Sequence, residues 1–299
     1  MSSIQLRLED DASPAFAEKV VGILNPAIAT DSHESHAEAA AALNSLFIED
    51  YTAQKTAGSF LWWFWDLIHD LARQIPYNRP EQDRLAAIIN NLTKLLSKTV
   101  DLGENWGASS VQVWAKLPMF GNTFREKLDD DDTRVSDESS KKERRINLQA
   151  FAARVASFGH FPFEVYAIWA LVDALEGTMT PIRGAPDEVN SDPTAVEDIS
   201  YKVKCAAVWT IHAGHLLYGR DEEIPGATAG PLWKLDKKEA MKLRRKFRGT
   251  DGLCSERWKL WKERFGVVRN DDRLDDETRG IAGEAYRVME KTEDQSNNK

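Results

Sequence analysis

The chain has 299 residues, of which 42% are hydrophobic and 29% are charged, a balance typical of a globular protein with enough material for a sizeable core. Its formal net charge of −9 argues against wholesale binding to nucleic acid or to an anionic membrane surface. The two cysteines, Cys205 and Cys254, are too few for a disulfide framework and indicate a reducing compartment. The polar, acidic start lacks a signal-peptide pattern, and no apolar run reaches the length of a membrane span. We therefore expect a protein of the cytoplasm or the nucleus.

Apolar residues recur at helical spacing in segment after segment, and no convincing strand stands out. The expected helices cover residues 13–24, 34–56, 59–75, 80–98, 147–158, 163–176, 200–218, 236–249, 255–266 and 276–291. This pattern predicts an all-α fold, a single compact domain of about ten helices. The helices at 163–176 and 200–218 are apolar almost all round, so we expect them at the centre.

We expect one domain to span residues 1–299, with its core at about 13–291. The charged stretch 129–145 and the stretch 178–192, which is rich in proline, glycine and acidic residues, are expected to be mobile loops. Residues 292–299 are expected to form a disordered tail.

The helix expected at 59–75 carries two apolar faces. Phe60, Phe64 and Leu67 share one face, and Trp62, Trp65 and His69 share the opposite one. The second face needs a cover of its own, either another helix layer or a ligand. We favour the core interpretation, in which the helix is sandwiched between layers, over a pocket wall in which His69 orients a ligand.

Two histidines stand three residues apart in the expected helix 200–218. The spacing of His212 and His215 could bind a metal, but no carboxylate accompanies them. We therefore expect core or near-surface histidines, with no metal and no other cofactor.

The segment 234–264 is strongly basic, with twelve lysines and arginines against five acidic residues. Lys238, Lys242 and Arg245 fall at helical spacing, which makes them a candidate anion-binding site for an acidic protein partner. The alternatives are an intramolecular partner for the acidic loops, or an ordinary solvated face.

Two short sequences at 230–233 and 255–261 carry a family resemblance. Gly230-Pro231-Leu232-Trp233, and Ser255-Glu256-Arg257-Trp258 followed by Trp261, resemble a family of helical proteins from ascomycete fungi that is catalogued as a domain of unknown function. The resemblance runs from about Trp63 to Met289. It implies a helical, cytosolic or nuclear fungal protein, and it carries over no catalytic residue.

Enzyme signatures are missing from the sequence, which has no glycine-rich phosphate loop and no HExxH, GxSxG or CxxC pattern. The leading hypothesis is a soluble, non-enzymatic helical protein that binds a protein partner or a small molecule. The alternative is a metal-free enzyme of fungal specialised metabolism, with a helix-lined aromatic pocket and His69 or His212 as acid or base. An enzyme should have a closed cavity that reaches a histidine and a carboxylate, whereas a binding protein should have an exposed apolar or basic groove.

Overall fold

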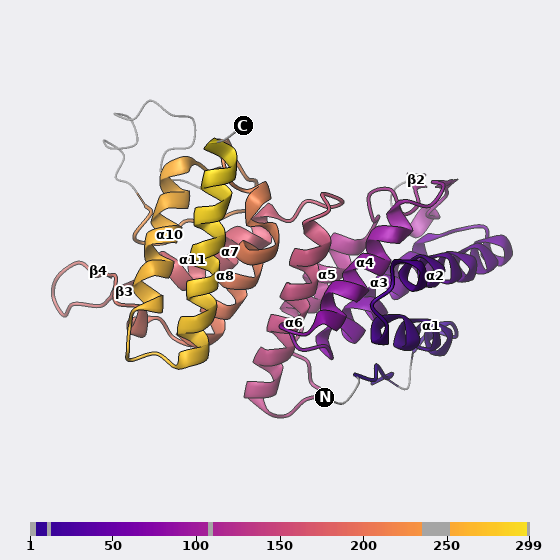
Figure 1. The fold of residues 1–299 in the computed structure, drawn as a ribbon, viewed down its shortest axis with the longest axis horizontal. Helices are drawn as coiled ribbons and strands as arrows, with labels where there is room; N and C mark the ends of the chain where they lie inside the picture. The colour runs from indigo at the N-terminus through magenta and orange to yellow at the C-terminus, as the bar shows by residue number, and fades with distance from the viewer. Residues whose placement is uncertain (1–3, 11–12, 107–109, 235–251, 298–299) are drawn as a thin grey trace. The chain divides into compact units, whose positions relative to one another are not determined.

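The computed structural model describes residues 4–10, 13–106, 110–234 and 252–297 (Figure 1). Ten α-helices lie in these ranges, and the strands among them are two or three residues long. The prediction of an all-α fold is confirmed. Contacts between Cα atoms divide the chain into two compact units, Met1–Pro162 and Phe163–Lys299, which are described separately below. The span of one domain over residues 1–299 stays a prediction.

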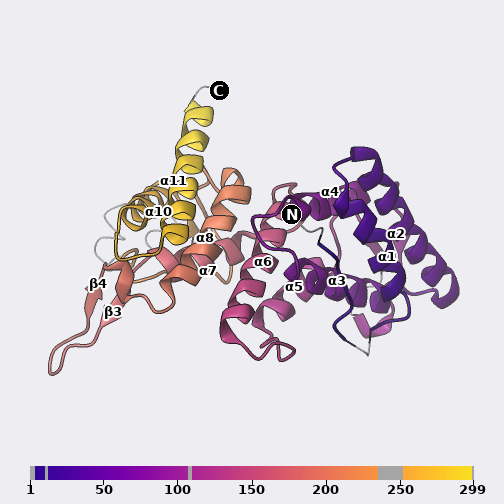
Figure 2. The same cartoon turned by 60° about the horizontal axis from the view of Figure 1, so that its bottom comes forward.

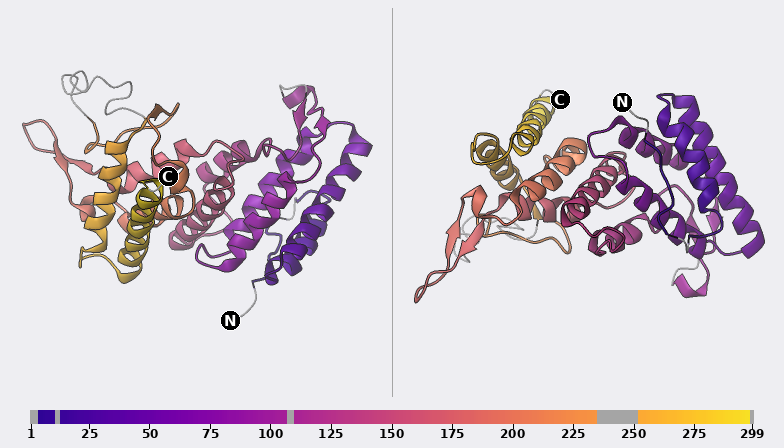
Figure 3. Two further views of the ribbon diagram at one scale, coloured as in Figure 1. Left: turned by 45° about the horizontal axis from the view of Figure 1, so that its top comes forward. Right: turned by 90° about the horizontal axis from the view of Figure 1, so that it is seen from below.

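The first unit contains six helices. They are α1 (Ala17–Ala29), α2 (His33–Gln54), α3 (Gly58–Arg73), α4 (Pro80–Thr93), α5 (Phe120–Asp129) and α6 (Glu138–Ala156). Helix α1 packs on α2 and α4, and α3 packs on α5 and α6. Between α4 and α5, strand β1 (Thr99–Val100) pairs antiparallel with β2 (Val111–Gln112), with Thr99 opposite Gln112. Figure 3 shows α1 and α2 lying side by side.

Helix α1 runs past its internal proline. The sequence predicted an end near Leu24, but the helix continues through Pro26 to Ala29. Proline removes a single backbone hydrogen bond here because it lacks only its own N–H. Burial of Ala27 and Ile28 in the turn that follows Pro26 contributes more than the missing bond costs.

The start of α3 needs a glycine. The amide of Gly58 donates to the carbonyl of Leu102 at 3.1 Å, and a Cβ at this position would lie 2.1 Å from the indole of Trp106. The close approach fixes the beginning of α3, and with it the directions of its aromatic side chains.

Helix α6 begins inside the segment that was expected to be a loop. Asp137 caps the helix by accepting a 2.8 Å hydrogen bond from the amide of Ser140. Residues 138–145 are therefore helical, which corrects the expected loop 129–145. An ion pair fixes the connection between α5 and α6, because Arg134 donates a hydrogen bond to the Asp70 carboxylate of α3 at 2.8 Å.

The second unit contains α7 (Glu164–Leu175), α8 (Ile199–Ala213), α10 (Ser255–Arg269) and α11 (Asp276–Asn297). Helix α8 packs on both α7 and α11, and α10 packs on α11. Strands β3 (Thr178–Thr180) and β4 (Glu188–Asn190) form an antiparallel hairpin with Thr178 opposite Asn190. The hairpin extends away from the helices of this unit (Figure 2). Strands β5 (Glu222–Glu223) and β6 (Gly252–Leu253) form another short pair.

Two expectations for the second unit need correction. The predicted loop 178–192 contains the β3–β4 hairpin, which a pattern of two or three residues is too short to reveal. The predicted tail is helical as far as Asn297. Glu293 holds it, because this carboxylate accepts hydrogen bonds from Trp258 at 2.9 Å and from Lys262 at 2.5 Å. Among the helices of the described ranges, none has the length and hydropathy that crossing a membrane requires.

Candidate functional site

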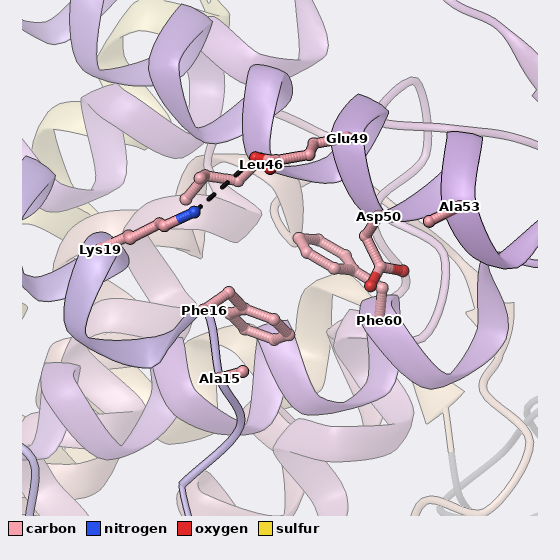
Figure 4. Close-up of a pocket in the computed structure, with 8 residues that line it drawn as sticks. All are labelled: Ala15, Phe16, Lys19, Leu46, Glu49, Asp50, Ala53 and Phe60. Atoms are coloured by element: carbon pink, nitrogen blue, oxygen red, sulfur yellow. Dashed lines mark ion pairs between the residues drawn. The ribbon is translucent and has the colours of Figure 1, made fainter.

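An open groove lies in the first unit where α1, α2 and the start of α3 meet (Figure 4). Its volume is about 250 Å³. The residues that line this α1–α2 groove are Ala15, Phe16, Lys19, Leu46, Glu49, Asp50, Ala53 and Phe60. They come from the end of the segment before α1, from the first turn of α1, from the last turns of α2 and from the first turn of α3.

Two phenylalanine rings form the aromatic part of the groove. The centroids of Phe16 and Phe60 lie 4.5 Å apart with 38° between the ring planes. Phe60 is buried and also packs against Phe64 and Phe47, with centroids 5.7 Å and 5.5 Å away. Because core neighbours fix Phe60, this part of the groove exists before anything binds, whereas the half-buried Phe16 lies at its edge.

The charges around the rings are unequally paired. Nζ of Lys19 lies 3.7 Å from the Glu49 carboxylate, and both side chains are largely exposed, at 61% and 72%. The half-buried Asp50 carboxylate has neither a hydrogen-bond donor nor an ion-pair partner among the described residues. Burial raises its pKa above the ordinary value of 3.8, as expected when a carboxylate loses water without gaining a cation.

The predicted pocket tryptophans lie away from this groove. Trp65 is fully buried, its Nε1 donates to the carbonyl of Pro118 at 2.8 Å, and its ring meets Trp114 and Phe120 edge-on. Trp62 is half-buried against Trp106, with ring centroids 5.4 Å apart. The placement of Trp65 agrees with the core interpretation of this face.

His69 lies in the core of the first unit with no exposed surface. Its Nε2 lies 3.2 Å from the carbonyl oxygen of Phe120, and since a carbonyl only accepts, Nε2 carries the proton. The rings of Phe120, Phe124 and Phe151 surround the imidazole with centroids 4.7–6.2 Å away. Burial lowers the pKa of His69 to about 3, so the ring is neutral throughout the physiological range.

The other candidate residues do not line the α1–α2 groove. His212 is half-buried in the last turn of α8, and His215 is exposed in the 3-10 turn that follows. The described residues contain no group of three or more histidine, cysteine or acidic side chains placed to hold a metal. Lys238, Lys242 and Arg245 lie outside the described residues, so their role stays a prediction.

A buried carboxylate organises the second unit. Glu176, just after α7, is fully buried and accepts hydrogen bonds from Nε of Arg257 at 2.7 Å and from Nε1 of Trp261 at 2.8 Å. The amide of Gly230 donates to its other oxygen at 2.6 Å. We call these four residues the Glu176 cluster. A buried charge is stable only when it is paired and hydrogen-bonded. Arg257 pairs with the Glu176 carboxylate, and Trp261 and Gly230 donate further hydrogen bonds to it.

The Glu176 cluster joins the two sequences that carry the family resemblance. The amide of Leu232 donates to the backbone carbonyl of Glu176 at 2.9 Å. A Cβ at Gly230 would lie 2.4 Å from the Cβ of Glu176, so only glycine fits. The guanidinium of Arg257 also lies over the rings of Trp261 and Trp233, 5.1 Å and 5.7 Å from their centroids. These resemblance-bearing residues therefore have a structural role.

The sequence profile of a family described as "Protein of unknown function (DUF3632)" matches residues 65–265, which is more than half of the chain. The chain belongs to the DUF3632 family. The DUF3632 match takes in the whole Glu176 cluster, whereas every residue that lines the α1–α2 groove precedes it. A search of curated proteins finds no match, and neither does a search of solved structures.

Sequence reasoning missed both the groove and the Glu176 cluster. The available signal for the groove was the spacing of Leu46, Asp50 and Ala53, which places an acidic residue between apolar ones on one helix face. The signal for the cluster was Glu176 itself, an acidic residue at the end of an almost wholly apolar helix. Neither signal indicates which residues, distant in the sequence, form the rest of the groove or of the Glu176 cluster.

Proposed function

We propose that this chain is a non-enzymatic helical protein that binds a segment of a partner protein in the α1–α2 groove. The observation that carries the proposal is an open, pre-formed hollow with two phenylalanine rings and a half-buried carboxylate that no side chain of the described residues pairs. A solvent-open hollow that combines a partly exposed aromatic ring with charged side chains is typical of a protein interaction site.

The size of the groove favours a partner segment over a small molecule. Sites for small molecules are concave, with volumes of about 300–1,000 Å³, and they enclose most of the ligand. The α1–α2 groove has about 250 Å³ and opens to solvent. One or two side chains of a larger molecule fill such a hollow, while the rest of that molecule lies across its rim.

The lining also fits binding better than catalysis. No histidine lines the groove, and His69, the acid or base of the alternative hypothesis, contacts core phenylalanines instead. General acid–base catalysis needs a titrating group within hydrogen-bond reach of the substrate. The described lining has two carboxylates and a lysine, and the lysine already pairs with the Glu49 carboxylate.

We also propose that the protein is fungal, from an ascomycete, and that it works in the cytoplasm or the nucleus. The support is the resemblance carried by the sequences around Trp233 and Trp258 and the scarcity of cysteine. A fluorescent fusion of the full chain in its own host should label one of these two compartments. Label confined to vesicles or the cell exterior would contradict this.

The test of groove binding is a selection of random twelve-residue peptides on the full chain by phage display. Enriched peptides are then compared on two variants of the same helix, Leu46→Ser inside the groove and Ile48→Ser outside it. Ile48 is apolar and 46% exposed but does not line the groove, which makes it a matched control.

We expect enriched peptides that lose binding to Leu46→Ser and keep binding to Ile48→Ser. Circular dichroism spectra that match the parent confirm that both variants are folded. Peptides that bind all three proteins equally, or no enrichment at all, would contradict the proposal.

A further inference from the structure

The charges of the α1–α2 groove leave one carboxylate unsatisfied. Among the described residues that line the groove, Lys19 is the only cation, and its ammonium group points at Glu49 (Figure 4). The three charges of these described residues sum to −1, and the excess belongs to Asp50. We infer that the partner segment places a lysine or arginine side chain against the Asp50 carboxylate and the half-buried ring of Phe16, an inference that rests on the proposed function.

A cation suits the Asp50 carboxylate and the Phe16 ring at once. A carboxylate that is half removed from water gains more from an opposite charge than an exposed one, because the surrounding dielectric constant is lower. The faces of aromatic rings attract lysine and arginine head groups within about 6 Å of the ring centroid. The apolar stem of the same side chain can lie along Leu46 and Ala53, since long basic side chains bury their methylene groups while the charge stays near water.

Other side chains fit the groove less well. A neutral side chain would cover Asp50 without pairing it, and covering an unpaired charge costs free energy. An acidic side chain would meet two carboxylates and be repelled. The net charge of −9 for the whole chain adds a long-range attraction for a basic segment.

Lys19 does not take this place itself. Its Nζ lies at the rim, 3.7 Å from Glu49, and both side chains are exposed, so this pair contributes little to stability. A partner cation can therefore reach Asp50 without displacing a buried interaction.

The experiment uses two capped tripeptides, leucine–arginine–leucine and leucine–citrulline–leucine, titrated into the full chain. Citrulline has nearly the shape of arginine but no charge, so the pair isolates the cation. Binding is followed by NMR through the amide shifts of the groove residues. The protein variants are Asp50→Asn, which keeps the side-chain shape, and Glu38→Gln, which removes an exposed charge elsewhere on α2.

We expect the arginine peptide to shift the groove amides and to bind about tenfold more tightly than the citrulline peptide. Asp50→Asn should remove this difference, and Glu38→Gln should leave it within about twofold. Equal affinity of the two peptides for the parent protein would overturn the inference, and so would an arginine preference that survives Asp50→Asn.

The outcomes also separate this inference from the proposed function. Equal binding of both peptides in the groove would keep the groove as a binding site and remove only its preference for a cation. The absence of groove shifts with either peptide would overturn the inference, and peptide selection would then decide the proposed function by itself.

Discussion

Glu176 and Arg257 form an ion pair with a distance of 2.7 Å, and neither side chain has any exposed surface. Taking two charges out of water is expensive, and the remaining donors and acceptors must be satisfied for the pair to persist. Here the guanidinium also donates to the carbonyls of Gly252 and Thr228. The pair thus ties α10 to the end of α7, to β6 and to the backbone at Thr228.

Removing both members of this pair should cost less than the two single removals added together. We expect Glu176→Gln and Arg257→Met each to lower the free energy of unfolding by about 3–5 kcal/mol, because each leaves an uncompensated buried group. The double variant should lose less than the sum of the two single losses. Urea unfolding followed by circular dichroism measures all three.

The control for this comparison is Lys204→Met in the same unit. Lys204 pairs with Glu277, whose side chain is 56% exposed, and surface pairs are worth about 0–1 kcal/mol. Losses for Glu176→Gln or Arg257→Met as small as the control's would contradict a structural role of the Glu176 cluster.

Helix α3 offers a matched pair of tryptophans. Trp65 is fully buried, whereas Trp63 on the same helix is 51% exposed. We expect Trp65→Ala to cost about 3–5 kcal/mol and to prevent soluble expression, because it opens a large cavity. Trp63→Ala should cost about 1 kcal/mol or less. Soluble yield and urea midpoints compare the two, and a well-folded Trp65→Ala protein with an unchanged midpoint would show that the core interpretation is wrong.

His69 should make the first unit sensitive to mild acid. Its pKa is about 3 in the folded chain against an ordinary value of 6.5. Between these values the unfolded chain binds the proton and the folded chain does not, so stability falls as the pH falls. Below pH 6.5 the free energy of unfolding falls by about 1.4 kcal/mol per pH unit, which gives a loss of about 2 kcal/mol by pH 5.

The variant His69→Gln isolates this effect, since the other titrating groups remain in both proteins. Between pH 7 and pH 5, the free energy of unfolding of the variant should fall by about 2 kcal/mol less than that of the parent. If the variant does not fold, the imidazole carbon shifts of the parent serve instead. A ring that titrates near pH 6.5 in the folded protein would refute the prediction.

The sequence predicted most helices of the described ranges because their signal is local, but it missed α5, and the helix expected at 236–249 lies outside the described residues. Apolar spacing on α3 and α4 follows from 3.6 residues per turn. The assignment of Phe64 and Trp65 to opposite faces was wrong, because their ring centroids lie 4.8 Å apart in the same core. The run through Pro26 was missed because tertiary burial of Ala27 and Ile28 decides it. The helical end at Asn297 depends on Glu293 reaching Trp258, which is a contact between helices.

The candidate site was harder to predict for the same reason. Asp50 and Phe16 lie on different elements, and no period in the sequence brings them together. His69 illustrates the opposite difficulty, since a histidine among aromatic residues fits both a pocket and a core. Only its hydrogen bond to Phe120 and its complete burial distinguish between these two environments.

The most direct measurement of groove binding is the dissociation constant of a selected peptide, determined by titration calorimetry on matched variants. Binding should weaken at least about tenfold in Leu46→Ser, because a lining side chain is truncated, and change by less than about twofold in Ile48→Ser. Equal dissociation constants for the two variants would contradict the account, because the peptide would then bind outside the α1–α2 groove.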